Sequence, residues 1–282
     1  MDAATLEREY NARASVPDFD AEYAEYVRLS HAAVARYSRI ADIVYDERSG
    51  ETLDIFPAGP DSPLFVWLHG GYWRALSKDD NAFVVDGLLP RGVSVAVVNY
   101  SLAPVVTLDE IIRQVRAALA WLFHHAGDYG IDPKRLHVGG SSAGGQLVGM
   151  LLAPGWTAPL GLPAHPIATA TALSGLFDLE PLRHISQNEW LHLDAEAARR
   201  NSPLFSVPTG SLTRLLVAAG GQETAEFRRQ SADYLRVWRE AGNAGDEIAL
   251  PGNNHFNIAV ALATPGNVLN QAVLDGIGVR TA

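Results

Sequence analysis

Short apolar runs alternate with amphipathic segments along most of the chain. A run that is apolar at every position is typical of a strand covered on both faces. Residues 64–68 form such a run, and similar, mostly apolar runs follow at residues 93–98, 136–138, 168–173, 215–219 and 247–250. The segments between them have helical spacing of apolar positions, roughly at residues 78–89, 107–125, 143–152 and 225–241. This alternation predicts an α/β fold with a mostly parallel central sheet flanked by helices.

The helix expected at residues 107–125 has the most regular pattern. Thr107 and Glu110 fit a capping box at its start. One apolar stripe follows at helical spacing, formed by Leu108, Ile111, Ile112, Val115, Leu119 and Leu122. We therefore expect this helix to pack one face on the sheet.

The first 56 residues have a different pattern. Residues 1–38 carry two helical segments, the second at about 20–37, and we expect a helical arm there that packs on the domain or covers an active-site mouth. Two short β patterns, at 39–45 and 51–56, are joined by a polar turn and predict a hairpin.

Composition limits the classes of protein. The chain has 282 residues, no cysteine and a formal net charge of −10. Unbroken α/β alternation without a repeat favours a single domain over residues 1–282. Spread acidic charge argues against nucleic-acid binding, and no apolar run approaches the ~20 residues that span a bilayer. Since the N-terminus also lacks a basic and apolar leader pattern, we expect a cytoplasmic protein without disulfides.

Gly140, Ser142 and Gly144 form a Gly-x-Ser-x-Gly turn after the apolar run at 136–138. A sharp strand-to-helix turn pushes a serine hydroxyl clear of the backbone, and the glycines leave room for it. The turn also places the Ala143 amide at a helix N-terminus, where it can stabilise an oxyanion. Ser142 is therefore the candidate nucleophile.

A second glycine turn, His69–Trp73, follows the run at 64–68. Because its glycines let the backbone approach a bound acyl oxygen, we expect the amides of Gly71 and Tyr72 to complete the oxyanion hole with Ala143. His69 is interpreted as a residue that holds this loop by hydrogen bonds rather than as a base.

The proton-transfer partners are expected late in the chain. His255 follows the last predicted strand in a polar turn and is the candidate general base. Glu223, after the run at 215–219, is the expected acid that orients His255, with Glu226 as the alternative. Asp178 also follows a strand and is assigned a loop-ordering or pocket role. The other histidines lack ligand-like spacing, so we expect no metal and no cofactor.

Several motifs resemble known hydrolases of the α/β-hydrolase fold. Asn99–Pro104 resembles the Tyr-Arg-Leu-Ala-Pro stretch of hormone-sensitive-lipase-like esterases, with Ser in place of Arg. The His-Gly-Gly-x-Trp form of His69–Trp73 is similar to the kynurenine formamidase (arylformamidase) branch, as are Glu7–Arg13, Ser174–Leu179 and Glu226–Ser231. The resemblance implies a Ser/acid/His hydrolase that cleaves N-formylkynurenine to kynurenine and formate. Family members commonly have Asp as the acid, whereas the matching position here is Glu223.

Three functions are compared. The first is the arylformamidase, and the second is a carboxylesterase for short acyl or aryl esters, which would use the same residues. The third is a non-catalytic small-molecule binding protein on this fold, which the presence of both Ser142 and His255 disfavours. Tyr72, Trp73 and Phe256 are expected to offer aromatic surfaces to a small-molecule substrate. Residues 181–210, a predicted cap or insert, and the N-terminal arm are expected to shape the pocket, and a homodimer is left open.

Overall fold

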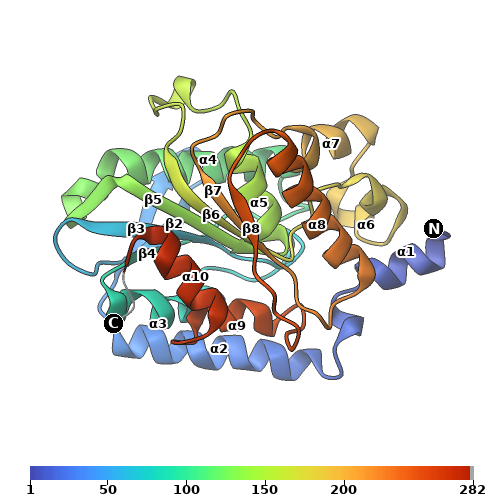
Figure 1. Ribbon diagram of the computed structural model, residues 1–282, viewed down its shortest axis with the longest axis horizontal. Coiled ribbons are helices and arrows are strands. Elements are labelled where there is room, and N and C mark those ends of the chain that lie inside the picture. Colours follow the sequence, from blue (N-terminus) through green and yellow to red (C-terminus); the bar gives the residue numbers. More distant parts are fainter. Residues whose placement is uncertain (280–282) are drawn as a thin grey trace.

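An eight-stranded sheet forms the centre of the protein in the computed structural model, which describes residues 1–279 (Figure 1). Its strands lie in the order β1-β2-β4-β3-β5-β6-β7-β8. The pairs β1/β2 and β2/β4 are antiparallel, and all later pairs are parallel. The predicted α/β fold with a mostly parallel sheet is confirmed. The strands are β1 (Ile40–Asp46), β2 (Glu51–Phe56), β3 (Ser62–Leu68), β4 (Ser94–Val98), β5 (Ile131–Ser141), β6 (Ile167–Leu173), β7 (Arg214–Ala218) and β8 (Gly245–Glu247).

Helices cover both faces of this sheet (Figure 1). One face packs against α4 (Leu108–His125), α5 (Ala143–Leu152) and α8 (Ala225–Glu240). The other packs against α2 (Phe19–Arg36), α3 (Val85–Leu88), α9 (Asn257–Ala263) and α10 (Val268–Ile277). Successive residues of β3 point into opposite cores, with Leu64 and Val66 in one and Phe65 and Trp67 in the other. This explains why the run is apolar at every position.

The first helix of the N-terminal arm lies beside the segment 181–210 beyond one end of the sheet, whereas the second helix of the arm runs along one face of the sheet (Figure 1). The arm contains α1 (Ala3–Tyr10), a 3₁₀ turn at Arg13–Ser15 and α2, which confirms the predicted pair of helices. The later segment is built from short helices, α6 (Asn188–Leu191) and α7 (Ala195–Arg200), between 3₁₀ turns at Glu180–His184 and Pro203–Phe205. Within residues 1–279, no helix is long and apolar enough to cross a membrane.

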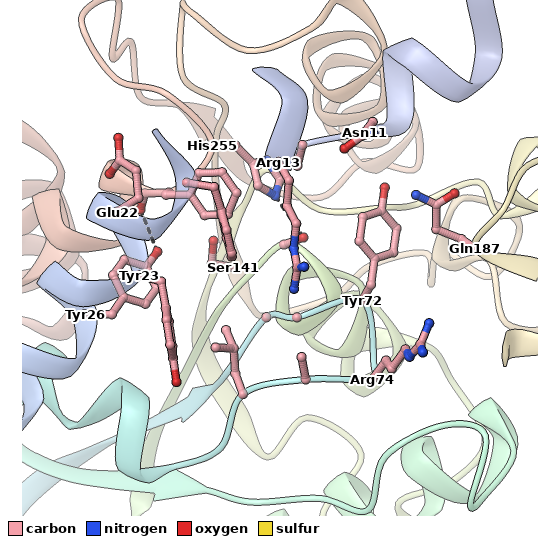
Figure 2. Close-up of a pocket in the computed structure, with 18 of the residues that line it drawn as sticks. Asn11, Arg13, Glu22, Tyr23, Tyr26, Tyr72, Arg74, Ser141, Gln187 and His255 are labelled. Carbon is pink, nitrogen blue, oxygen red and sulfur yellow. Dashed lines mark hydrogen bonds between the residues drawn. The ribbon is translucent and has the colours of Figure 1, made fainter. Parts of the chain in front are cut away.

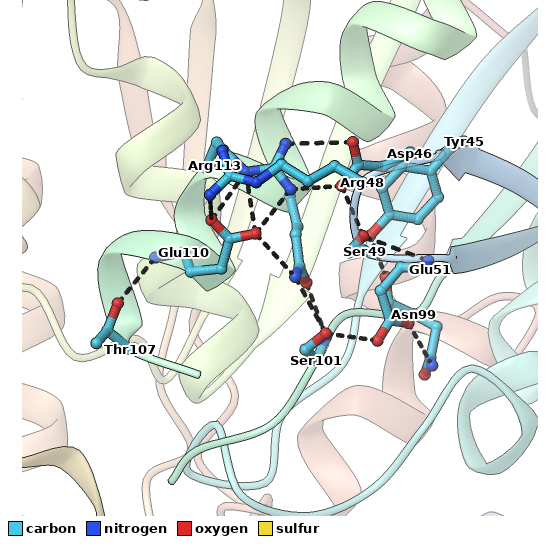
Figure 3. A network of polar contacts seen from close by, with 11 residues as sticks. Tyr45, Asp46, Arg48, Ser49, Glu51, Asn99, Ser101, Thr107, Glu110 and Arg113 are labelled. Carbon is cyan, nitrogen blue, oxygen red and sulfur yellow. Dashed lines mark hydrogen bonds and ion pairs between the residues drawn. The ribbon is translucent and has the colours of Figure 1, made fainter. Parts of the chain in front are cut away.

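The start of α4 differs in one detail from the predicted capping box (Figure 3). The Thr107 hydroxyl accepts the Glu110 amide at 3.3 Å, as expected for an N-cap. The Glu110 carboxylate does not return to Thr107 but pairs with Arg113, which also pairs with Asp46 at the end of β1. Hydrogen bonds from Arg113 lower the pKa of both carboxyl groups. The network ties the β1–β2 hairpin to α4.

Two predicted elements are shorter than the sequence pattern indicates. The helix expected at 78–89 is a 3₁₀ turn at Asp79–Val84 followed by the single turn of α3. There the Asn81 side chain donates to the Ser77 carbonyl and accepts from the Trp67 indole, and such local bonds compete with a regular helix.

The last strand occupies Gly245–Glu247 rather than 247–250. Beyond it a single isolated bridge pairs Leu250 with Gly220, and the Leu250 carbonyl accepts the Gly221 amide at 2.9 Å.

Candidate active site

Ser142 stands at the turn between β5 and α5, with backbone angles φ 59° and ψ −118°. The chain can make this turn because two glycines permit close backbone contact. A Cβ at Gly140 would lie 2.4 Å from the Gly144 carbonyl oxygen, and one at Gly144 would lie 2.0 Å from the Leu68 carbonyl oxygen. The Ser142 amide donates to the Leu173 carbonyl of β6 at 2.8 Å, which fixes the turn to the sheet. The turn predicted from Gly-x-Ser-x-Gly is present.

The imidazole of His255 lies beside this serine. Its Nε2 is 3.0 Å from Ser142 Oγ, and the residue is 4% exposed. The loop that carries it is held by the Asn254 side chain, whose oxygen accepts the amides of Phe256 and Asn257 at the start of α9. The Phe227 ring packs on the imidazole at 4.3 Å between centroids. His255 is therefore positioned by the hydrogen bonds of its loop and by the packing of Phe227 on one face of its ring.

Glu223 is the carboxylate that reaches His255. Its Oε2 is 2.7 Å from His255 Nδ1, and its side chain has no solvent exposure. Its other oxygen accepts the Ser174 hydroxyl and the Gly220 amide, each at 2.5 Å. These two bonds set the longer glutamate side chain back so that it meets the imidazole edge.

The alternative acid, Glu226, lies elsewhere. Its carboxylate accepts the Tyr10 hydroxyl at 2.8 Å and pairs with Arg229 at 2.7 Å. The hydrogen bond from Arg229 lowers the pKa of Glu226, so this carboxylate is charged and fully engaged. It contributes to the attachment of the N-terminal arm to α8. Asp178 caps its own loop by accepting the Glu180 amide, and it does not line the cavity.

Three backbone amides stand free beside Ser142. Those of Gly71, Tyr72 and Ala143 donate no hydrogen bond to any acceptor in residues 1–279. Gly71 has φ 101°, and a Cβ there would lie 2.1 Å from the Ala75 carbonyl oxygen, so only glycine fits this loop. Unpaired amides at the end of a strand and at a helix N-terminus suit an anionic oxygen.

His69 lies under this loop and away from the serine. Its Nδ1 is 2.8 Å from the Gly70 carbonyl oxygen, and its ring stacks on Tyr100 at 4.0 Å. Burial lowers the pKa of His69 to about 4, so the ring is neutral near pH 7. These contacts agree with its predicted role in holding the loop.

A cavity of about 510 Å³ opens above Ser142 and His255 (Figure 2). The glycine loop contributes one wall, and the segment 181–210 contributes Ser186, Gln187 and Trp190. The opposite wall comes from the N-terminal arm, which supplies Asn11, Ala12, Arg13, Phe19, Glu22, Tyr23 and Tyr26. Phe256 and Tyr72, which are expected to offer aromatic surfaces to a substrate, also line the cavity.

The prediction that Trp73 lines the pocket is wrong. The residue is fully buried, and its indole donates to the Gln146 side chain at 3.1 Å, beneath the glycine loop. A positive φ of 55° turns Trp73 toward the core after Tyr72. Trp190 of α6 also lines the cavity, and its indole donates to the Tyr72 carbonyl at 3.2 Å; the sequence does not predict this, because one aromatic residue in a single-turn helix gives no signal of its place in the fold. Among the described residues, no group of three or more His, Cys, Asp or Glu side chains could hold a metal ion.

Comparison with known proteins places the chain among hydrolases. Kynurenine formamidase from Danio rerio is 32% identical over 246 residues, which cover 85% of this chain and 82% of that protein. The chain belongs to the kynurenine formamidase family. Its residues 53–155, from β2 to just beyond α5, also match the BD-FAE family model.

This member of the kynurenine formamidase family is also similar to other hydrolases and to a solved structure. The carboxylic ester hydrolase LipN of Mycobacterium tuberculosis is 30% identical over 210 residues, covering 67% of this chain and 55% of LipN. A crystal structure of a protein from Silicibacter sp. TM1040 is 28% identical and has a TM-score of 0.79, over 98% of this chain and 99% of that chain. The fold is thus the α/β-hydrolase fold over nearly the whole chain.

Proposed function

We propose that this protein is a serine hydrolase that cleaves the N-formyl amide of N-formylkynurenine, giving kynurenine and formate in tryptophan breakdown. The observation that carries the proposal is the continuous contact from Ser142 Oγ through His255 to Glu223 at 3.0 and 2.7 Å, in a chain of the kynurenine formamidase family. This order of nucleophile, base and acid is the one that acyl-transfer chemistry requires.

In the first half of the proposed reaction, His255 Nε2 takes the Ser142 proton as the serine oxygen attacks the formyl carbon. The amides of Gly71, Tyr72 and Ala143 donate to the oxyanion that forms. Glu223 keeps the Nδ1 proton of the imidazole in place and stabilises the imidazolium. Collapse of the intermediate breaks the C–N bond, and His255 gives its proton to the departing arylamine.

In the second half, His255 takes a proton from water as the water oxygen attacks the formyl ester of Ser142. The second tetrahedral intermediate collapses to formic acid as His255 returns its proton to the serine oxygen, and the acid loses its proton to solvent to give formate. The sequence of steps uses no metal and no cofactor, because acid–base chemistry and hydrogen bonds supply every proton and charge that moves.

The cavity suits an aromatic substrate of modest size. Its volume of about 510 Å³ lies in the range of small-molecule pockets. Rings of Phe19, Tyr26, Tyr72, Trp190 and Phe256 line it and offer faces and edges to an aryl group. We propose that residues 1–282 act as one domain, in which the arm (1–38) and the cap segment (181–210) together select the substrate. The cytoplasmic location and a homodimer stay predictions.

A carboxylesterase for short acyl or aryl esters is the second candidate. The similarity to LipN favours it, and the same serine, histidine and oxyanion donors would serve an ester. The two candidate functions use the same catalytic residues and differ only in the substrate that the pocket accepts.

Turnover of N-formylkynurenine against a series of 4-nitrophenyl esters distinguishes them. We expect the larger kcat/KM for the formamide, with Ser142→Ala as the control that removes both activities. Ester hydrolysis that is far faster than formamide hydrolysis would favour the carboxylesterase.

A further inference from the structure

Two arginines line the cavity without a carboxylate partner. Neither Arg13 nor Arg74 forms an ion pair with any residue in 1–279. Each lies over an aromatic ring instead, Arg13 over Phe19 at 4.4 Å and Arg74 over Trp190 at 4.6 Å from the ring centroid. The stacking positions each guanidinium while it leaves the N–H groups free to donate.

The two side chains differ in direction (Figure 2). Arg13 extends from the N-terminal arm into the cavity, whereas the guanidinium of Arg74 is turned away from His255 toward the opposite rim. Only Arg13 therefore presents its donors to a molecule held above Ser142 and His255.

Nothing in the described part of the cavity neutralises Arg13. The one acidic residue that lines the cavity is Glu22, and its carboxylate accepts the Asn254 amide group at 2.5 Å. A guanidinium presents a planar fork of donors that matches a carboxylate in two parallel hydrogen bonds. Partial enclosure by the cavity strengthens such a pair relative to one in open water.

We propose that Arg13 is a specificity-determining residue that binds the carboxylate of an amino-acid-bearing aryl substrate. The proposal rests on the proposed function, because N-formylkynurenine carries an α-carboxylate at the end of the molecule remote from its formyl group. With the formyl carbon at Ser142 and the aryl group among the aromatic side chains, the carboxylate extends toward the arm. Neutral aryl formamides and short esters lack this contact, so Arg13 selects the anionic substrate over them.

The test is discrimination between a charged and a neutral formamide. N-formylkynurenine is compared with 2-formamidoacetophenone, which keeps the formamide and the aryl ketone but lacks the amino acid group. We expect Arg13→Gln to reduce the ratio of kcat/KM for the two substrates by about 10–100-fold, since a hydrogen bond to a charged group contributes on that scale. The loss should appear in KM for N-formylkynurenine, because the contact is made equally in the ground state and the transition state. Arg13→Lys, which keeps the charge without the fork, should restore part of the ratio.

Arg199→Gln is the matched control. Arg199 also lies over a phenylalanine ring, Phe205 at 4.7 Å, forms no ion pair within residues 1–279, and does not line the cavity. Arg199→Gln should leave the ratio of kcat/KM for the two formamides unchanged. An unchanged ratio in Arg13→Gln would overturn the proposal, as would a larger loss in Arg74→Gln than in Arg13→Gln.

A binding measurement separates this proposal from the proposed function. L-kynurenine and its decarboxylated analogue are tested as competitive inhibitors of 4-nitrophenyl acetate hydrolysis. We expect L-kynurenine to inhibit the wild-type protein more strongly, and Arg13→Gln to remove the difference. If the protein hydrolyses no formamide but the Arg13-dependent difference remains, the proposed function is wrong and the anion site stands. Equal inhibition by both compounds in the wild-type protein would contradict the anion site even where formamide is hydrolysed.

Discussion

The hydrogen bonds around Glu223 hold its carboxylate in one orientation, against the imidazole of His255. Its two oxygens are divided between the imidazole of His255 on one side and Ser174 and Gly220 on the other. A buried carboxylate with every bond satisfied holds the imidazole in one tautomer and one orientation. Glu226, three residues later, has a comparable set of bonds but directs them to Tyr10 and Arg229.

This division predicts different effects for two matched substitutions. Glu223→Gln should lower kcat by about 10³–10⁴-fold, because an amide in this place favours the wrong tautomer of the base. Glu226→Gln should change kcat by only a few-fold and instead lower the melting temperature, since it breaks the pair with Arg229. Steady-state kinetics and thermal melts of both variants make the comparison. The assignment fails if Glu226→Gln has the larger effect on kcat.

At the residue scale, the sequence predicts the parts of the site that depend on local backbone geometry. The serine turn and the glycine loop have such signals, because Gly140, Gly144 and Gly71 stand where a Cβ would collide with backbone. The placement of Trp73 could not be predicted, since the pattern places an aromatic residue in a loop but does not determine the φ that turns it toward the core.

At the scale of elements, the N-terminal arm forms part of the site, because it contacts the loop that carries His255 as well as lining the cavity. The Tyr26 hydroxyl of α2 donates to the Phe256 carbonyl at 2.6 Å, and Glu22 one turn earlier accepts from Asn254. Both bonds reach the loop that carries His255. The arm thus supplies one cavity wall and also fixes the loop of the base.

Removing the Tyr26 hydroxyl should therefore affect both stability and catalysis. Tyr26→Phe removes one of two hydrogen bonds to the Phe256 carbonyl, which still accepts the Ala259 amide, at a cost of about 1 kcal/mol. We expect a lower free energy of unfolding together with a several-fold lower kcat, because the loop of the base gains freedom. Tyr23→Phe is the control, since the Tyr23 hydroxyl bonds to Asp80 at the surface and should matter little. Equal effects of the two substitutions on kcat would argue against a role of α2 in holding the loop.

The helical nature of the arm follows from periodicity, but its contacts do not. Tyr26 and Phe256 are separated by more than two hundred positions, and no local pattern indicates that two such residues meet. The edges of the sheet illustrate the same limit. The apolar pattern predicts a strand over residues 247–250, whereas the ladder ends at Glu247 and only Leu250 makes a further bridge.

At the scale of the whole molecule, buried histidines link stability to pH. His69 and His137 are both enclosed by the core, and burial lowers the pKa of each to about 4. In the unfolded chain a histidine takes up a proton below pH ~6.5. The unfolded state therefore binds more protons between pH 6.5 and 4, and the free energy of unfolding falls as the pH is lowered through this range.

Each of these two histidines should contribute on the order of 3 kcal/mol to that loss at most. His137→Gln, which can retain a hydrogen bond to Thr169, should make the decline with acid shallower. His165→Gln, at an exposed position, should leave the decline as it is in the wild-type protein. Urea unfolding of the three proteins at several pH values between 4 and 7 measures the slopes. A decline in His137→Gln as steep as in the wild-type protein would exclude the proposed linkage.

The order of apolar runs and amphipathic segments was sufficient to predict this architecture, because runs buried on both faces occur where helices cover both sides of a parallel sheet. The two cores confirm the reason, since neighbouring residues of β3 enter different clusters. The cavity could not be predicted in the same way, because its walls come from segments far apart in the sequence, and no local pattern specifies how these segments contact one another.

The most direct test of the account is formate release from N-formylkynurenine by the wild-type protein and by variants of two adjacent serines. Ser142 contacts His255, whereas Ser141 also lines the cavity but makes no bond to that imidazole. We expect turnover by the wild-type protein, a loss of about 10⁵–10⁶-fold in Ser142→Ala, and activity within about tenfold of wild type in Ser141→Ala. Formate release by Ser142→Ala at a rate close to that of the wild-type protein, or none by the wild-type protein itself, would contradict it.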